Sequence, residues 1–184
     1  MINIAYIVLT YDEPELLRRV AKALEYGNDR IFVHVDKKSD ISQFVKAVGN
    51  LKNVTFIKDR VDVYWGGFNS IVATMNLYRD VLQDKVRYDR IILLQGKDYP
   101  LYSPTYLHSF FEERMTEEFC KAKNITKSDN PHDYMKCFGY WSLDGKRTLA
   151  KKLFNKVLSF FNTKVKIKYR RGCYVVGGVI WNMY

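Results

Sequence analysis

Several signals that would classify a protein at once are missing from this chain of 184 residues. Its three cysteines, Cys120, Cys137 and Cys173, form no C-x-x-C pair and have no histidine at ligand spacing, so neither a disulfide framework nor a zinc site is expected. No G-x-G-x-x-G follows the first apolar run, and no G-x-x-x-x-G-K-[ST] occurs, which argues against dinucleotide and P-loop sites. No G-x-S-x-G or H-E-x-x-H occurs either.

The chain also lacks an apolar stretch of about 18 residues and a basic leader followed by an apolar core. It opens with a strand-like run, Ile4 to Leu9. From these features we expect a cytoplasmic protein, with a peripheral position at the inner face of the membrane as a further possibility. The histidines His34, His108 and His132 have no partner at nucleophile or metal spacing, and a structural or exposed role is expected for each.

Negative charge is scarce near the carboxyl terminus. From Lys136 onward, 11 lysines and arginines face one acid, Asp144, whereas the first 135 residues hold 19 bases and 19 acids and are neutral. This basic part can attract nucleic acid, anionic lipid or a phosphorylated substrate, or it can be an ordinary solvated face. The stretch Lys146–Phe161 has the pattern of a basic amphipathic helix, which suits either an anionic membrane surface or a protein core.

What the chain has in quantity is alternation between short apolar runs and stretches with apolar residues at helical spacing. This alternation is typical of an α/β fold with a mostly parallel central sheet. Asp12 or Glu13 can cap the first helix, with Pro14 in its first turn. The predicted strands are Ala5–Thr10, Arg30–Asp36, Val54–Ile57 and Ile91–Leu94, and the predicted helices are Leu16–Leu24, Ile41–Val48, Ile71–Leu82, Pro104–Arg114 and Lys146–Phe161.

Three segments near the carboxyl terminus are less regular. Lys121–Asp133 is polar and is predicted as a loop, and Lys164–Lys168 alternates as a half-exposed strand does. The apolar run Cys173–Trp181 ends without a stop signal. We therefore expect the domain to continue past Tyr184.

Two predicted strands end in a carboxylate, Asp36 after the second and Asp98 after the fourth. Parallel strands bring their carboxyl ends to one edge of the sheet, where open α/β sheets bind ligands, so we expect these two strands to be neighbours and both carboxylates to border one crevice. Gly96 would let the backbone approach a ligand, and Pro100 would stop the strand. The alternative for Asp98 is an ordinary turn in which it accepts local backbone hydrogen bonds.

Between the third and fourth strands lies Tyr64-Trp65-Gly66-Gly67, just before a predicted helix. Glycines at a helix N-terminus can bind a phosphate, and the aromatic pair can stack on a base. An ordinary Gly-Gly turn is the alternative.

Four blocks coincide in order and spacing with those of a known family. They are Ala5-Tyr6-Ile7-Val8-Leu9, Val33-His34-Val35-Asp36-Lys37-Lys38-Ser39, Trp65-Gly66-Gly67, and Asp89 to Leu101. Through them the chain, over roughly its first 110 residues, resembles the core-2/I-branching β-1,6-N-acetylglucosaminyltransferases and the related peptide O-xylosyltransferases.

The resemblance implies a GT-A type, Rossmann-like glycosyltransferase that inverts the anomeric centre. It implies a UDP-sugar donor, no metal and no other cofactor, and a glycan or polysaccharide as acceptor. By position, Val8 would contact the uracil through its backbone, Asp36 would hold the nucleoside, Trp65 would pack on it, and Asp98 would line the donor-sugar end.

The family's catalytic glutamate, in a Pro-Asp-Glu block after a Gly-Ser-x-Trp-Trp block, is not found here, and Gly177–Trp181 is only a loose echo of the second block. The catalytic residue is therefore unknown and expected beyond Tyr184, as are the cations that bind the diphosphate. Residues 1–184 would be a single glycosyltransferase domain, with 1–110 as the nucleotide-sugar half and 111–184 as the start of a truncated acceptor half.

The transferred sugar would be N-acetylglucosamine or a xylose-like sugar, and no nucleic acid partner is expected. The alternative from another class is a non-catalytic basic module that binds nucleic acid or an anionic membrane surface through the carboxyl-terminal part.

Overall fold

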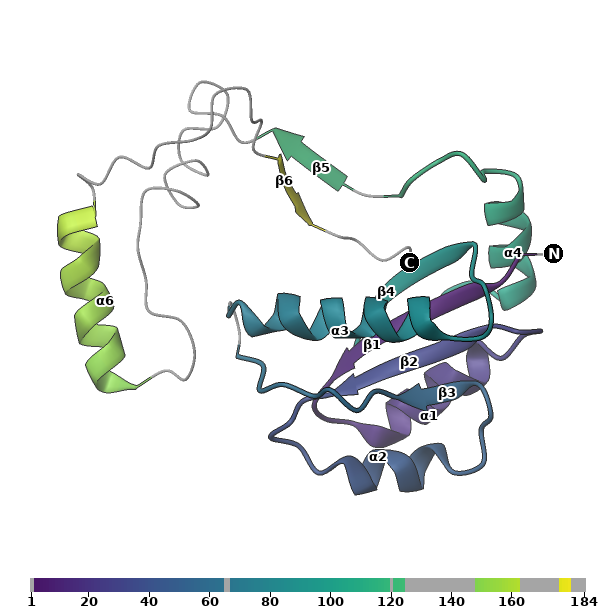
Figure 1. The fold of residues 1–184 in the computed structure, drawn as a ribbon, viewed down its shortest axis with the longest axis horizontal. Coiled ribbons are helices and arrows are strands. Elements are labelled where there is room, and N and C mark those ends of the chain that lie inside the picture. The colour runs from purple at the N-terminus through teal and green to yellow at the C-terminus, as the bar shows by residue number, and fades with distance from the viewer. Residues whose placement is uncertain (1, 65–66, 120, 125–147, 163–175, 180–184) are drawn as a thin grey trace. The chain divides into compact units, whose positions relative to one another are not determined.

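The computed structural model describes residues 2–64, 67–119, 121–124, 148–162 and 176–179 (Figure 1). These residues fall into two compact units, one ending at Phe119 and the other running from Lys121 to Val179. Each unit is described by itself.

The first unit is built on a four-stranded sheet of β1 (Ile4–Thr10), β2 (Arg30–Val35), β3 (Val54–Phe56) and β4 (Arg90–Gln95). The strands lie in the order β3-β2-β1-β4, and every pair is parallel (Figure 1). The predicted α/β fold with a mostly parallel sheet is confirmed.

Helices cover both faces of this sheet. α1 (Pro14–Ala23), α2 (Ile41–Val48) and α4 (Pro104–Glu112) contribute buried residues to one apolar cluster, and α3 (Asn69–Gln83) contributes to a second. Alternate residues of β1 enter the two clusters, Ile4 and Tyr6 the first and Ala5 and Ile7 the second. β1 is therefore buried on both faces, which explains why its sequence is an unbroken apolar run.

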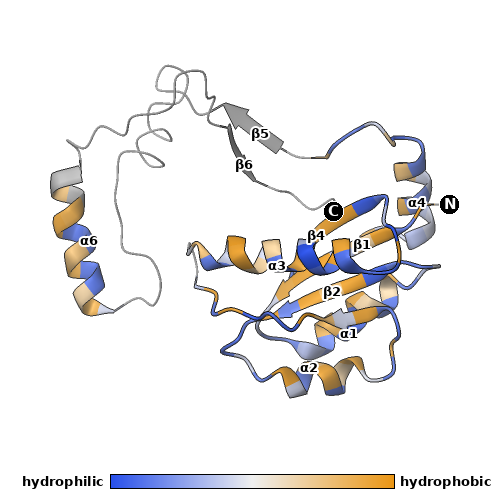
Figure 2. Ribbon diagram, in the orientation of Figure 1, coloured by the Kyte–Doolittle hydropathy of each residue, from blue (hydrophilic) through white to orange (hydrophobic). Residues whose placement is uncertain are grey.

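Figure 2 shows the consequence for the pattern of hydropathy. β1 and β2 are hydrophobic along most of their length, whereas the helices carry both hydrophobic and hydrophilic residues. Each large side chain that becomes fully buried, such as Ile4 or Ile7, contributes about 1.5–3 kcal/mol to folding. The central strand therefore contributes strongly to the stability of this unit.

The start of α1 differs from the prediction. Glu13 takes the N-cap position in the left-handed conformation, with φ 55° and ψ 62°, and its side chain makes no capping hydrogen bond. The predicted capping by an acid is wrong for Glu13, because a left-handed residue directs its side chain away from the amides of the first turn. In contrast, Asp40 caps α2 and Ser103 caps α4. A non-glycine residue in the left-handed conformation is strained, and such strain is concentrated at functional sites.

The second unit contains β5 (Lys121–Asn124) and β6 (Val176–Val179), which pair antiparallel, and the helix α6 (Leu149–Asn162). The predicted amphipathic helix is confirmed to within three residues at its start. The prediction of a loop from Lys121 is wrong for its first four residues, because β6, far along the chain, supplies the partner that makes them a strand. The strand predicted over Lys164–Lys168 lies outside the described residues.

Candidate functional site

The carboxyl edge of the sheet is the candidate site because successive strands join the sheet first on one side of β1 and then on the other. From β1 the chain adds β2 and β3 on one side, and it then adds β4 on the other side of β1. The order of the strands therefore changes side at β1, and open α/β sheets bind ligands at such a topological switch point.

Asp36 and Asp98 both lie at this edge, as predicted, since they follow β2 and β4. The prediction that these two strands are neighbours is wrong, because β1 lies between them. The crossover through α3 carries the chain over β1 to its far side. The end of β1, at Thr10 to Glu13, thus stands between the two carboxylates.

Asp36 is a hub of hydrogen bonds and is only 6% exposed. Its amide donates to the Thr10 carbonyl at 2.8 Å. Its Oδ1 accepts from the Lys38 amide at 2.9 Å, its Oδ2 accepts from Lys38 Nζ at 2.7 Å, and the Val63 amide donates to Oδ2 at 3.3 Å. The carboxylate is therefore satisfied within the protein, and a ligand must replace one of these donors to reach it.

The donor that can be replaced is Lys38, whose side chain is 41% exposed. Its Nζ also donates to the Val63 carbonyl at 2.6 Å and lies 4.3 Å from the centre of the Tyr64 ring. The lysine thus joins the end of β2 to the segment that leads into Trp65. Because the Lys38 side chain is already partly exposed, its charge can return to water when it moves.

Two further side chains fix this segment against β2. Arg60 donates to the carbonyls of Val35 at 2.8 Å, Asp36 at 2.7 Å and Ser39 at 2.7 Å. His34 is buried, and its Nε2 accepts from the Val61 amide at 3.0 Å. Burial lowers the pKa of His34, so the neutral ring that serves as an acceptor is favoured. The structural role expected for this histidine is confirmed.

The loops after β1 and β4 touch each other at Gly96. A Cβ added there would lie 2.7 Å from Thr10 Oγ1 and 3.1 Å from Thr10 Cα. Beyond it, Lys97 Nζ lies 3.1 Å from Glu13 Oε1 and 3.4 Å from Asp12 Oδ2. The absence of a side chain at Gly96 lets the two loops meet at the switch point, and Lys97 bridges the acids of the first loop.

Asp98 makes a local contact. Its amide donates to the Gln95 carbonyl at 3.0 Å, and its Oδ2 accepts from the Gln95 amide at 2.8 Å. The ordinary-turn interpretation of Asp98 therefore describes a contact that the structure contains. Its role at the donor sugar stays a prediction.

The other two residues predicted to bind the donor, Val8 and Trp65, are not seen at the carboxyl edge in the part of the chain that the structure describes. Val8 is buried inside β1, paired with Val33 on one side and Leu94 on the other, so the residue of β1 nearest the edge is Thr10. Trp65 lies outside the described residues. The assignments of both to the nucleoside stay predictions.

The opposite edge of the sheet holds a pair that sequence reasoning missed. His108 Nε2 lies 2.7 Å from Asp29 Oδ2, and Asp29 Oδ1 accepts from the Ile4 amide at 2.7 Å. Both side chains are buried, and burial raises the pKa of Asp29. The two residues are 79 positions apart, so no local spacing signals the pair.

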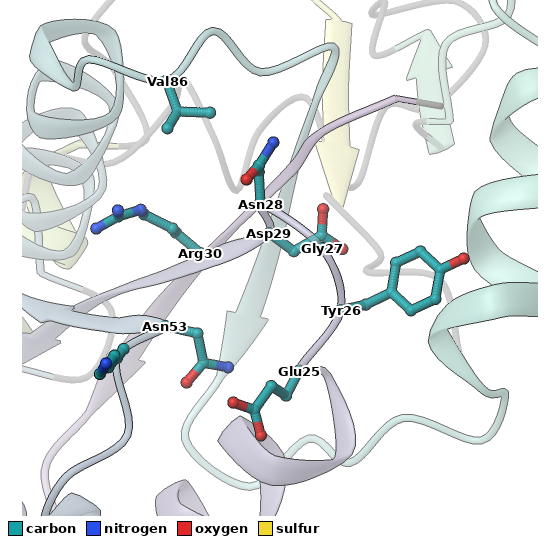
Figure 3. Close-up of a pocket in the computed structure, with 9 residues that line it drawn as sticks. Glu25, Tyr26, Gly27, Asn28, Asp29, Arg30, Asn53 and Val86 are labelled. Carbon is teal, nitrogen blue, oxygen red and sulfur yellow. The ribbon is translucent and has the colours of Figure 1, made fainter.

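Two cavities of the first unit are lined by neither Asp36 nor Asp98. One, of about 180 Å³, is lined mainly by the loop that precedes β2, together with Asn53 and Val86 (Figure 3). The other, of about 430 Å³, lies between β3 and α3 and has the acids Asp59, Asp80 and Asp84 in its wall. Over the ranges that the structure describes, no group of three or more histidine, cysteine, aspartate or glutamate side chains could hold a metal ion.

Comparison with known proteins decides the family. A family model described as Core-2/I-Branching enzyme matches residues 4–162. The chain belongs to this family. The resemblance seen in the four sequence blocks is thus confirmed, and the parallel sheet with helices on both faces agrees with a GT-A type fold.

Individual relatives of this Core-2/I-Branching family member are distant. Xylosyltransferase 1 of Canis lupus familiaris is 24% identical over 160 residues, which cover 79% of this chain and 16% of the relative. The beta-1,3-galactosyl-O-glycosyl-glycoprotein beta-1,6-N-acetylglucosaminyltransferase 4 of Danio rerio is 27% identical over 104 residues, covering 54% and 24%. The beta-1,3-galactosyl-O-glycosyl-glycoprotein beta-1,6-N-acetylglucosaminyltransferase 3 of Bos taurus is 26% identical over 136 residues, which cover 72% of this chain and 30% of the relative. The chain thus spans less than a third of each of these relatives.

Proposed function

We propose that this chain forms the donor-binding part of an inverting, metal-independent glycosyltransferase. The enzyme moves N-acetylglucosamine or a xylose-like sugar from a UDP-sugar to a hydroxyl of a glycan or polysaccharide. The observation that carries the proposal is the position of Asp36 and Asp98 at the switch-point edge of the sheet, within the residues that match the family.

Asp36 is proposed to hold the nucleoside. The hydroxyls of a ribose or the N–H of a uracil can donate to its carboxylate in place of Lys38 Nζ, which now lies 2.7 Å from Oδ2. Because the carboxylate keeps the Val63 and Lys38 amides as donors, it is not left unsatisfied during the exchange. The released lysine keeps its charge at the same edge, where it can offset the charge of a diphosphate.

The reaction is a direct displacement at the anomeric carbon. A base removes the proton of the acceptor hydroxyl while the departing UDP gains negative charge that must be stabilised. We assign the described edge to donor binding, and the base follows the family expectation of a glutamate beyond Tyr184. Sugar transfer by residues 1–184 alone would contradict that assignment.

Calorimetric titration of UDP in the presence of EDTA tests the donor site. The wild-type chain is expected to bind, and Asp36→Ala is expected to weaken binding by about 10- to 100-fold, since a hydrogen bond to a charged group is lost. Asp89→Ala is the matched control, because that carboxylate accepts from the Asn3 amide at the amino edge of the sheet. Equal affinity for wild type and Asp36→Ala would remove Asp36 from the site, and a requirement for added metal would refute metal independence.

A peripheral contact with an anionic membrane is also part of the proposal, together with a cytoplasmic location. α6 exposes Leu149, Leu153 and Phe160, and it carries three lysines and no acid. These features suit a helix that lies in the surface of an anionic bilayer. None of the described helices is both long enough and apolar enough to span a bilayer.

Co-sedimentation with phosphatidylserine vesicles tests this contact, and neutral phosphatidylcholine vesicles give the baseline. Binding is expected to fall with salt and to be lost in K152E/K156E. K22E/K46E, which changes two exposed lysines on α1 and α2, makes the same change of charge elsewhere and should leave binding largely intact. Equal loss in the two variants would show a general charge effect, which would contradict a role for α6.

A further inference from the structure

A row of exposed aromatic side chains follows Asp98 directly and has no role in the donor site. The rings of Tyr102 and Tyr106 stack on each other, with centroids 4.6 Å apart and planes inclined by 25°. Tyr102 is 47% exposed and Tyr106 is 48% exposed, and Leu101 beside them is 73% exposed. We call Tyr99, Leu101, Tyr102 and Tyr106 the tyrosine platform.

The platform is not the core side of its helix. α4 buries Leu107, His108 and Phe111, and these residues hold it against the sheet. Tyr102 precedes the N-cap Ser103, and its ring stacks on that of Tyr106 in the first turn, where both rings are about half exposed. The Ser103 side chain accepts from the Tyr106 amide at 3.3 Å, which fixes this first turn, and the Arg19 guanidinium over the Tyr99 ring, 5.5 Å from its centre, holds the other end.

The chemistry of the platform favours a neutral partner with both apolar and hydroxyl-bearing surfaces. Residues 99–106, Tyr-Pro-Leu-Tyr-Ser-Pro-Thr-Tyr, include no charged side chain. Tyrosine offers a flat apolar face together with a phenolic hydroxyl, and it loses little conformational entropy on binding. A pyranose ring presents the complementary surface, since one face is lined by C–H groups and its rim carries hydroxyls.

We propose that the tyrosine platform binds a neutral sugar unit of the acceptor glycan. This inference rests on the proposed function, because the platform begins at the residue after Asp98 and so continues the edge assigned to the donor. A neutral glycan lying on Tyr102 and Tyr106 would extend along α4 away from the edge, with its terminal hydroxyl directed to the donor. A basic peptide would find no acid in residues 99–106, and the cation placed on the platform, Arg19, lies over Tyr99 and not over the stacked rings of Tyr102 and Tyr106, where the neutral sugar is proposed to lie.

The test is a titration of the full chain with lactose and with N,N′-diacetylchitobiose, followed by saturation-transfer NMR on the sugar protons. At least one of these neutral disaccharides is expected to bind, with the strongest transfer to C–H protons of one ring face. Y102A/Y106A is expected to weaken binding by roughly 10-fold, whereas Y102F/Y106F, which keeps both rings, should stay within about threefold of wild type.

Leu82→Ala, an exposed apolar residue on α3, is the matched control and should not change binding. The proposal is overturned if neither disaccharide binds, or if Y102A/Y106A binds as wild type does. It is also overturned if Y102A/Y106A lowers the melting temperature far more than Leu82→Ala, since the rings would then be packed under another part of the protein.

Stabilisation by UDP, measured on the same samples, separates this inference from the proposed function. If UDP raises the melting temperature and no disaccharide binds, the platform assignment alone is wrong. If UDP has no effect on wild type, the proposed function is wrong.

Discussion

The two edges of the sheet carry an aspartate in contrasting surroundings. At the amino edge, Asp29 is held by the Ile4 amide and by His108, which lie 25 and 79 residues away, and all of these groups are buried. At the carboxyl edge, the side-chain partner of Asp36 is Lys38, two residues away and 41% exposed. The first carboxylate has no partner that can leave without stranding a buried charge, whereas the second has one that can return to water.

This difference distinguishes Asp29, which has a structural role, from Asp36, which is proposed to bind a ligand. Burial raises the pKa of Asp29, and the hydrogen bonds from His108 and Ile4 oppose that rise. Burial and the nearby Asp29 also raise the pKa of Tyr6. The amino edge is therefore a closed polar network whose members stabilise α4 against β1, and the carboxyl edge is where ligand exchange is possible.

The largest effect is expected from His108→Ala. This change leaves the Asp29 carboxylate buried, with the hydrogen bond from the Ile4 amide but without its partner His108, so the free energy of unfolding should fall by about 3–5 kcal/mol. Urea denaturation at neutral pH measures this loss.

The corresponding change at the other edge is Lys38→Met, which removes the side-chain partner of Asp36. A loss below about 1 kcal/mol is expected, because Lys38 is substantially exposed and the carboxylate keeps two backbone donors. Equal losses in the two variants would break the comparison between the edges.

An effect between those of His108→Ala and Lys38→Met is expected from Gly96→Ala at the switch point. The new methyl group would lie 3.1 Å from the Thr10 Cα, which is backbone and cannot rotate away. The free energy of unfolding should therefore fall by about 1–3 kcal/mol. Thermal and urea denaturation report the loss, and the double variant T10G/G96A should recover part of it because the Thr10 side chain is gone. A fully stable Gly96→Ala would show that the loops after β1 and β4 are not tightly packed.

A gradual effect is expected from acidification at the carboxyl edge. The pKa of His34 is lowered in the folded state, so its contribution to stability is present above its ordinary value of 6.5 and is lost as pH falls below it. Unfolding free energy should decline by at most about 1.4 kcal/mol per pH unit from this group. His34→Gln can still accept from the Val61 amide but does not titrate, so the difference between the two pH profiles isolates the effect.

Asp29 acts in the opposite direction in the same experiment. Its folded pKa is raised above 3.8, so its contribution becomes more favourable as pH falls through that raised value. At low pH the buried Asp29 at the amino edge should therefore become neutral, which favours folding. Protonation of His34 at the carboxyl edge should lower the free energy of unfolding. Identical pH profiles for wild type and His34→Gln would contradict this division.

The sequence predicted the elements of the first unit well, because each leaves a local pattern. The apolar run of β1 and the Asp that follows β2 are visible without coordinates, and parallel strands must bring Asp36 and Asp98 to one edge. Strand order leaves no such pattern, so the position of β1 between the two carboxylates could not be predicted. The capping prediction for α1 failed because the left-handed backbone of Glu13 leaves no local pattern either, and the Glu13 side chain contacts Lys97 from the loop after β4.

Contacts between distant residues account for the rest of what was missed. Nothing near Asp29 in the sequence indicates His108, and nothing near Lys121 indicates that β6 pairs with it. At the site, the placement of Asp36 followed from the strand pattern, but its hydrogen bond from Val63 depends on the path of residues 58–64 across the sheet edge.

The central position of β1 has a consequence for how the chain is made on the ribosome. One side of β1 can pair with β2 once residue 35 has emerged, but the other side waits for β4, which begins at residue 90. Throughout the synthesis of residues 36–89, the most apolar strand of the nascent domain offers an open edge to any other strand. Nascent chains stalled within this interval should therefore be those that most need a chaperone.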